Sequence, residues 1–64
     1  MNQDKEALKA EVKYLRGKAD EAQQEVQRAN WANRPGDSQY HSGLRVGYLN
    51  AANDLDRIIE KMKG

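Results

Sequence analysis

The side chains best suited to bind a ligand or partner are concentrated between Arg28 and Tyr48, in the middle of the chain. This segment holds the only Trp, the only His and the only Pro, whereas its flanks consist mainly of Lys, Glu, Ala, Leu and Ile. Arginine, amide and aromatic groups bind planar or anionic partners, whereas Lys and Glu mostly solvate a helix surface. The candidate ligand-binding residues are Arg28, Trp31, Asn33, Arg34, Tyr40, His41, Arg45 and Tyr48.

Three arginines flank the proline, and antiparallel pairing of helices would bring Arg28 near Arg45. Neighbouring guanidinium groups repel each other unless an anion lies between them, and each presents paired donors to phosphate or carboxylate. Two interpretations are open. Either Arg28, Arg34 and Arg45 form an anion clamp, or they are solvated side chains of which Asp37 neutralises one.

The aromatic side chains also allow two interpretations. Trp31 lies outside the apolar stripe of its helix, so it either packs against a neighbouring subunit or offers a stacking surface. Tyr40 and Tyr48 are two helical turns apart and could line one groove beside Arg45, as in a site for a nucleotide-like ligand. Alternatively, both tyrosines are core or interface residues with their hydroxyl groups in water.

Catalysis and nucleic-acid binding are not expected from this composition. Asp37, His41 and Ser42 have the residue types of a catalytic triad, but on a helix Ser42 projects about 100° away from His41. The chain has no Cys and one His, which predicts no metal site, and we expect no cofactor. With 11 basic and 10 acidic residues the net charge is +1, and no basic stripe indicates DNA binding.

Apolar and small residues recur with alternating spacings of four and three in two segments, as in paired helices. The first stripe contains Leu8, Val12, Leu15, Ala19, Ala22, Val26 and Ala29, and the second contains His41, Leu44, Tyr48, Ala51, Leu55, Ile58 and Met62. Between them Pro35 disfavours a helical Arg34, and Gly36 allows a chain reversal. We expect one domain over residues 1–64, with a helix over about 3–33, a turn at 34–37 and a helix over about 38–63, begun by Asp37 or Ser38 as the cap.

This organisation predicts an all-α fold, an antiparallel, coiled-coil-like two-helix hairpin in which residues whose numbers sum to about 71 lie side by side. Glycine within a helix costs about 1 kcal/mol relative to alanine, so Gly43 and Gly47 indicate close approach of another backbone or a ligand. We expect them at a tight waist opposite Ala22 and Ala29. Because two helices leave one side of the core open to water, we also expect self-association into a homo-oligomeric bundle.

The segment from Tyr40 to Leu55 reads YHSGLRVGYLNAANDL. It resembles a pattern, YxxGxxxGYxxAxxDL, of small uncharacterised helical accessory proteins encoded by bacteriophages. The resemblance covers residues 40–55 only and transfers no site residue. It implies a phage-type accessory or counter-defence protein that acts by binding, either blocking a host or defence protein or sequestering a signalling nucleotide in the host cell cytoplasm.

Together these features predict a soluble cytoplasmic binding module that is not an enzyme and begins at its initiator Met1, because no secretory signal pattern or membrane-spanning apolar run is present. An oligomer could sequester an anionic nucleotide-like small molecule. Alternatively, the chain could inhibit a host or defence protein through its turn and helix faces, since Trp, Tyr and Arg dominate interface hot spots. A pocket where Arg and Tyr converge would favour sequestration, which the many hydrogen-bonding side chains slightly favour, and an exposed patch around Trp31 would favour inhibition.

Overall fold

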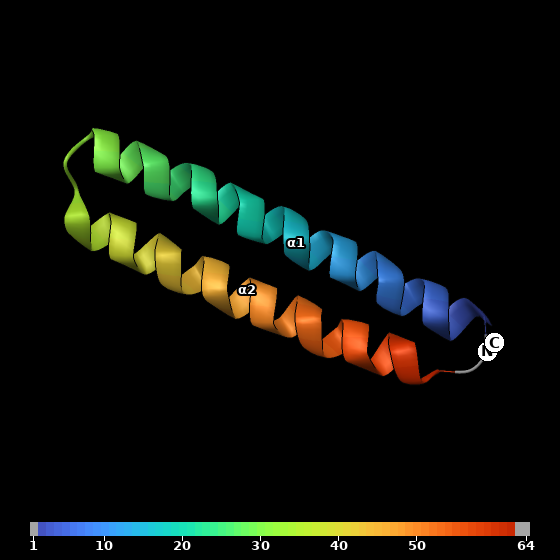
Figure 1. Cartoon of the computed structure of the whole chain (residues 1–64). Helices are drawn as coiled ribbons and strands as arrows, with labels where there is room; N and C mark the ends of the chain where they lie inside the picture. The colour runs from blue at the N-terminus through green and yellow to red at the C-terminus, as the bar shows by residue number, and fades with distance from the viewer. Residues whose placement is uncertain (1, 63–64) are drawn as a thin grey trace.

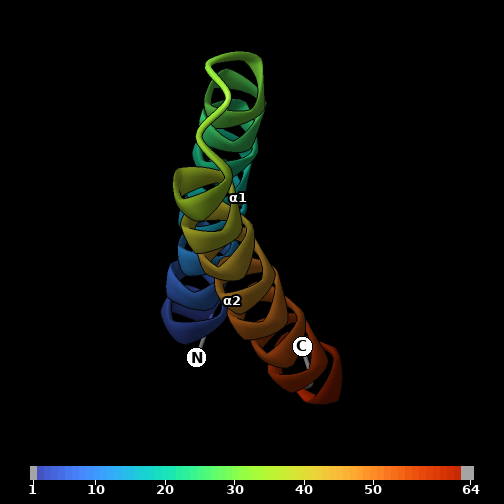
Figure 2. The same cartoon turned by 90° about the vertical axis from the view of Figure 1, so that its left-hand side faces the viewer.

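The chain folds into two long antiparallel helices joined by one short turn, shown for this computed structural model in Figure 1. The structure describes residues 2–62. Helix α1 spans Asn2–Trp31 and helix α2 spans Pro35–Lys61. They form a rod with extents of 49 × 14 × 10 Å, and in the view from the turn end the two helices are inclined to each other (Figure 2). The predicted all-helical hairpin is confirmed.

Helix α1 packs through the stripe that the sequence predicts. Val12, Ala19, Ala22 and Ala29 are buried, and Leu8, Leu15 and Val26 are half-buried. The alternating spacing keeps these residues on one side of the helix, facing α2. Because most of the buried residues are alanines, the core between the two helices contains little side-chain volume.

Helix α2 packs through a stripe that differs from the prediction in its C-terminal half. Ala52 is fully buried and Ile59 is half-buried, whereas Ala51 and Ile58, which were predicted to face α1, are exposed. After Tyr48 the next residue of the observed stripe is Ala52, four positions later, whereas the predicted heptad continues at Ala51, three positions later. A strict seven-residue repeat drifts by about 20° per heptad on a straight helix, and a step of four corrects that drift.

The predicted register between the helices is confirmed by an ion pair between Arg16 of α1 and Asp56 of α2, whose numbers sum to 72. Both side chains are partly exposed, so the pair fixes alignment more than it adds stability. The expected glycine waist is wrong. A Cβ atom on Gly43 or Gly47 would meet no atom within 4 Å, so both glycines lie outside the interior of the hairpin.

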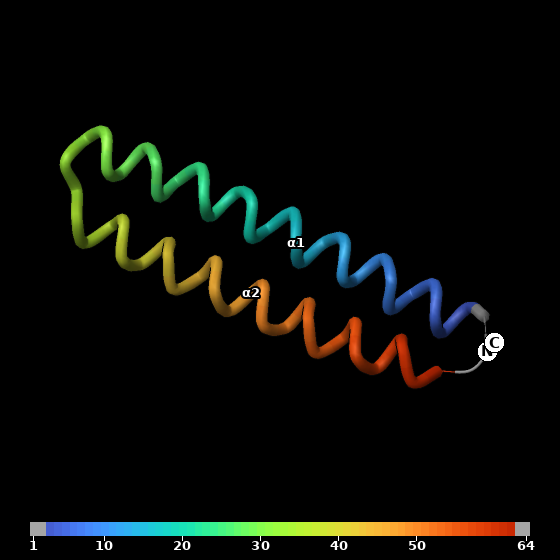
Figure 3. Tube along the Cα trace, viewed as in Figure 1, coloured from blue at the N-terminus to red at the C-terminus, as the bar shows by residue number. Residues whose placement is uncertain are grey.

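The turn between the helices is a Schellman motif, and Figure 3 traces its path. The Arg34 amide donates to the Ala29 carbonyl at 2.7 Å, and the Asn33 amide donates to the Asn30 carbonyl at 3.1 Å. This pattern requires a left-handed residue at Asn33, which has a φ of 59°. Asn33 therefore supplies the reversal that was expected from Gly36.

Helix α2 begins at Pro35, earlier than the expected start near Ser38. Proline suits the first helical position because its φ is fixed near the helical value and the amide it lacks would be unpaired there. Arg34 is the N-cap residue and makes no side-chain capping hydrogen bond, so neither Asp37 nor Ser38 is the cap. Within residues 2–62, no helix has an apolar stretch long enough to cross a membrane.

Candidate functional site

Most of the predicted binding residues lie at the turn end of the hairpin. Arg28 and Trp31 belong to the last turns of α1, Arg34 joins the helices, and Tyr40 and His41 lie in the second turn of α2. The Schellman turn brings these segments together because it reverses the chain within three residues, Ala32 to Arg34.

A cavity of about 300 Å³, here called the turn cavity, lies where α1, the turn and the start of α2 meet. Its lining residues are Glu25, Arg28, Ala29, Ala32, Arg34, Asp37 and His41. Alanine side chains leave this space open, and cationic side chains border it. The turn cavity thus unites three of the predicted site residues.

Each arginine of the turn cavity already has a carboxylate partner close to it in sequence. Arg28 Nη1 lies 2.9 Å from Glu25 Oε1, and Arg34 Nη1 lies 3.9 Å from Asp37 Oδ2. Arg28, Arg34 and Asp37 are largely exposed and Glu25 is partly exposed, so these are weak, solvated pairs. The geometry matches solvated arginines more closely than a preformed anion clamp.

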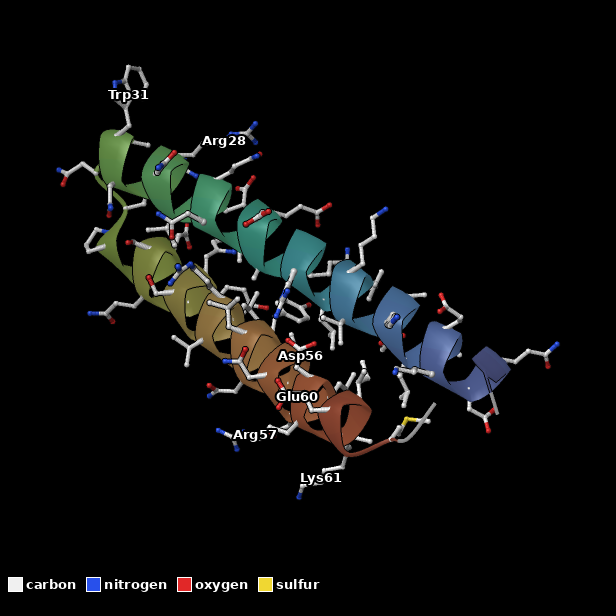
Figure 4. All side chains as sticks on the ribbon, turned by 45° about the vertical axis from the view of Figure 1, so that its right-hand side comes forward. Arg28, Trp31, Asp56, Arg57, Glu60 and Lys61 are labelled. Atoms are coloured by element: carbon white, nitrogen blue, oxygen red, sulfur yellow. The ribbon has the colours of Figure 1, made fainter. Side chains whose placement is uncertain are left out.

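Trp31 is 92% exposed and projects from the end of α1. In Figure 4 both Trp31 and Arg28 point away from α2. Together with Gln24, Gln27 and Ala32 they line a shallow surface hollow of about 600 Å³ that is open to solvent, here called the Trp31 cavity. Within the hairpin, Trp31 therefore contributes little to packing and presents a large apolar surface.

Tyr40 and His41 form an aromatic pair at the start of α2, with ring centroids 5.1 Å apart and an interplanar angle of 74°. Tyr40 is 64% exposed, whereas His41 is half-buried. This edge-to-face contact orients the imidazole, which borders the turn cavity.

The remaining predicted residues do not join this site. Arg45 lines neither the turn cavity nor the Trp31 cavity, and because Arg28 points away from α2, the two arginines do not converge. Tyr48 is half-buried and lines a separate cavity of about 170 Å³ between the helices, which shares Glu25 and His41 with the turn cavity but is not lined by Tyr40. Asn33 serves the turn through its backbone conformation.

Comparisons with protein-family models, with curated proteins and with solved structures found no match. Among residues 2–62, no group of three or more His, Cys, Asp or Glu side chains could hold a metal ion. The turn end of the hairpin can make two kinds of contact through its side chains. Trp31 can make apolar contacts, and Arg28 and Arg34 can donate charge-assisted hydrogen bonds.

Sequence reasoning missed the polar residues that accompany these side chains. Gln24, Gln27 and Glu25 border the two cavities. Gln24 and Glu25 lie four and three residues before Arg28, and Gln27 lies four residues before Trp31, spacings that place each beside its neighbour on a helix. It also missed Lys18, whose ammonium lies 3.3 Å from Glu21 Oε2 and 5.6 Å from the centre of the Tyr14 ring. The hydrogen bond from Lys18 to Glu21, followed by the charge of Glu21 and by Tyr14, raises the pKa of Lys18 above its ordinary value.

Proposed function

We propose that this chain is a non-enzymatic binding module that docks a partner protein on the turn end of the hairpin, with Trp31 as the anchor. The observation that carries the proposal is the 92% exposure of Trp31. A tryptophan in an interface buries roughly 150–250 Å² of surface. In the isolated hairpin that surface faces water, so its burial against a partner would contribute a large hydrophobic term to the free energy of binding.

The surroundings of Trp31 support the same proposal. Arg28 lines the Trp31 cavity beside it, and Trp and Arg are residue types that dominate interface hot spots. Gln24 and Gln27 supply amides that can donate to and accept from a partner backbone. An exposed aromatic anchor beside an arginine favours protein inhibition over sequestration.

The resemblance of residues 40–55 to phage-encoded accessory proteins supports a choice of partner. We place the protein in the host cell cytoplasm, where its partner would be a host or defence protein. Binding would act by occlusion, because the residues of the turn end supply recognition chemistry and no arrangement of acid, base and nucleophile.

Sequestration of an anionic, nucleotide-like small molecule is the second candidate function. It is favoured by the turn cavity, where Arg28, Arg34 and His41 border one space. A phosphate would have to compete with Glu25 and Asp37 for the two guanidinium groups. Bidentate hydrogen bonds from arginine would compensate for that competition.

Self-association into a helical bundle belongs to the same proposal. Four of the five buried residues within 3–62 are alanines, and the larger Leu, Ile and Met side chains of the two stripes are at most half-buried. Small domains with so thin a core gain stability by oligomerisation. The partner would then meet the turn ends of an assembly.

Replacement of Trp31 by alanine should abolish or strongly weaken partner binding while the hairpin stays folded. The immobilised wild-type protein would be used to isolate a partner from host lysate, which would be identified, purified and titrated against each variant. We expect the dissociation constant to rise at least about tenfold for Trp31→Ala, because truncation of a hot-spot tryptophan removes its buried contact. Since the chain has one Trp, its fluorescence should also shift on binding to the wild type.

The matched control is Val46→Ala, which truncates another exposed apolar side chain, on the second helix. Wild-type affinity for Trp31→Ala, or an equal loss for Val46→Ala, would refute the anchor. Calorimetric titration with cyclic and linear nucleotides tests the second candidate. Heat that is lost in Arg34→Ala and kept in Trp31→Ala would favour sequestration.

A further inference from the structure

The hairpin has two long faces of different character, and the ion pair between Arg16 and Asp56 marks one of them, here called the Arg16 face. Tyr14 and Ile58 each lie two residues from a member of that pair, which is about 160° around a helix. They therefore lie on the opposite side, here called the Tyr14 face. Lys18 lies beside Tyr14 on this face.

Of the large exposed apolar side chains that the described helices carry outside the turn end, two of three lie on the Tyr14 face. Tyr14 is 58% exposed and Ile58 is 49% exposed, whereas Val46 lies elsewhere on α2. Ala51 is seven residues from both Leu44 and Ile58, and Gly47 is three residues after Leu44, so both share this side of α2. The small Gly47 and Ala51 let another helix approach closely here, and the cavity beneath, lined by Lys18 and Leu44 among others, lies open between the helices.

Charges on the Tyr14 face are arranged in a complementary way. Lys18 is on α1 and Asp54 is on α2, and their numbers sum to 72, as do those of Tyr14 and Ile58. This is also the sum for Arg16 and Asp56, so the members of each pair lie at the same height along the rod. Lys18 pairs with Glu21 at 3.3 Å and Asp54 pairs with Arg57 at 3.7 Å, through exposed i,i+3 contacts that leave both charges solvated.

We propose that the Tyr14 face is covered by the Tyr14 face of a second copy of this chain, with both turn ends on the same side of the dimer. A twofold axis along the rod then sets α1 of one copy against α2 of the other at equal height. Lys18 of each copy meets Asp54 of the other, and Tyr14 meets Ile58. The inference deepens the self-association proposed above, naming its face and orientation, and also places both Trp31 anchors at one end.

The opposite orientation is disfavoured by charge. If the turn ends pointed apart, α1 would lie on α1, and its Tyr14 face carries Glu11, Glu21 and Glu25. In that arrangement α1 meets α1 and α2 meets α2, so Lys18 of one copy cannot meet Asp54 of the other and the complementary contact is lost. With the turn ends together, Glu21 and Glu25 lie opposite the small Ala51 and Gly47 of the other copy, where they remain accessible to water.

Charge reversal in separate chains tests the pairing. Lys18→Asp places two acidic residues at the contact, and Asp54→Lys places two basic ones. Each variant alone should dimerise at least about tenfold more weakly than the wild type in sedimentation equilibrium, because both symmetry-related contacts become repulsive. An equimolar mixture should recover dimers, since each acidic chain then meets a basic one. Recovery in a mixture cannot come from contacts within one chain.

Two control variants carry the same charge changes on the other side of α1, Lys9→Asp and Asp20→Lys, at positions bordering a cavity with Arg16. They should dimerise like the wild type. Equal weakening in the controls, or no recovery on mixing, would overturn the pairing. A wild-type chain that stays monomeric at high micromolar concentration would overturn the dimer and leave the Trp31 proposal standing.

Cross-linking tests the orientation, because the chain has no native Cys. Chains carrying Tyr14→Cys and chains carrying Ile58→Cys should form a mixed disulfide on mild oxidation. Val46→Cys, in place of Ile58→Cys, serves as the exposed control and should not link. Cross-links of Tyr14→Cys only to itself would indicate α1 against α1 and overturn the proposed orientation.

Discussion

Ala52→Leu should destabilise the hairpin by about 1–3 kcal/mol, because a leucine there overpacks the contact between the helices. Ala52 is 0% exposed, and Ala19, 2% exposed, lies within one residue of the same height on α1 by the register that Arg16 and Asp56 define. Two facing alanines let the helix axes approach closely. A larger side chain must separate the helices or leave its preferred rotamer. Urea denaturation followed by circular dichroism, at concentrations where the chain is dilute, measures the loss.

Ala51→Leu is the matched control for this prediction. It makes the same chemical change one residue earlier, at an exposed position, and it should leave the stability of the isolated hairpin nearly unchanged. The two variants also discriminate between the two packings of α2. If Ala51→Leu proved the more damaging, α2 would pack through the uninterrupted heptad that contains Ala51 and Ile58, contrary to the structure.

The packing stripes of the two helices were predictable from the sequence except where neighbouring residues are identical in type. The stripe of α1 has one solution, because charged residues occupy the positions beside Val12. In α2, Ala51 precedes Ala52 and Ile58 precedes Ile59, so a shift of one residue leaves the apolar pattern unchanged. Only the packing of two nearly straight helices over their whole length selects the step of four after Tyr48.

The position of the candidate site along the chain was predictable, and its geometry was not. Residue type alone drew attention to the segment around Trp31, and the structure places much of that segment at one end of the rod. Whether Arg28 meets Arg45 depends on the direction of each side chain around its helix. Arg28 lies just before the buried Ala29, and one residue rotates a side chain by about 100°. That rotation turns Arg28 to the outer surface.

Asn33 should be important for stability and replaceable by glycine. Its φ of 59° lies in the left-handed region, where side chains branched at Cβ clash with the backbone. Asn33→Ile should therefore cost about 1–2 kcal/mol or more of unfolding free energy, since left-handed backbone is unfavourable by that amount even for ordinary residues. Asn33→Gly should be as stable as the wild type or slightly more so, because glycine is the usual residue at this position of a Schellman motif.

The same pair of variants separates the two roles that Asn33 could have. The sequence suggested the side-chain amide of Asn33 as part of a binding site. In the structure its backbone conformation closes the turn, through hydrogen bonds from the backbone N–H groups of Asn33 and Arg34. If the role is conformational, Asn33→Gly keeps both the melting temperature and partner binding, although it lacks the amide. If Asn33→Gly folds normally but binds the partner as weakly as Trp31→Ala, the side chain itself contacts the partner. The turn would then be part of the docking surface as well as its support.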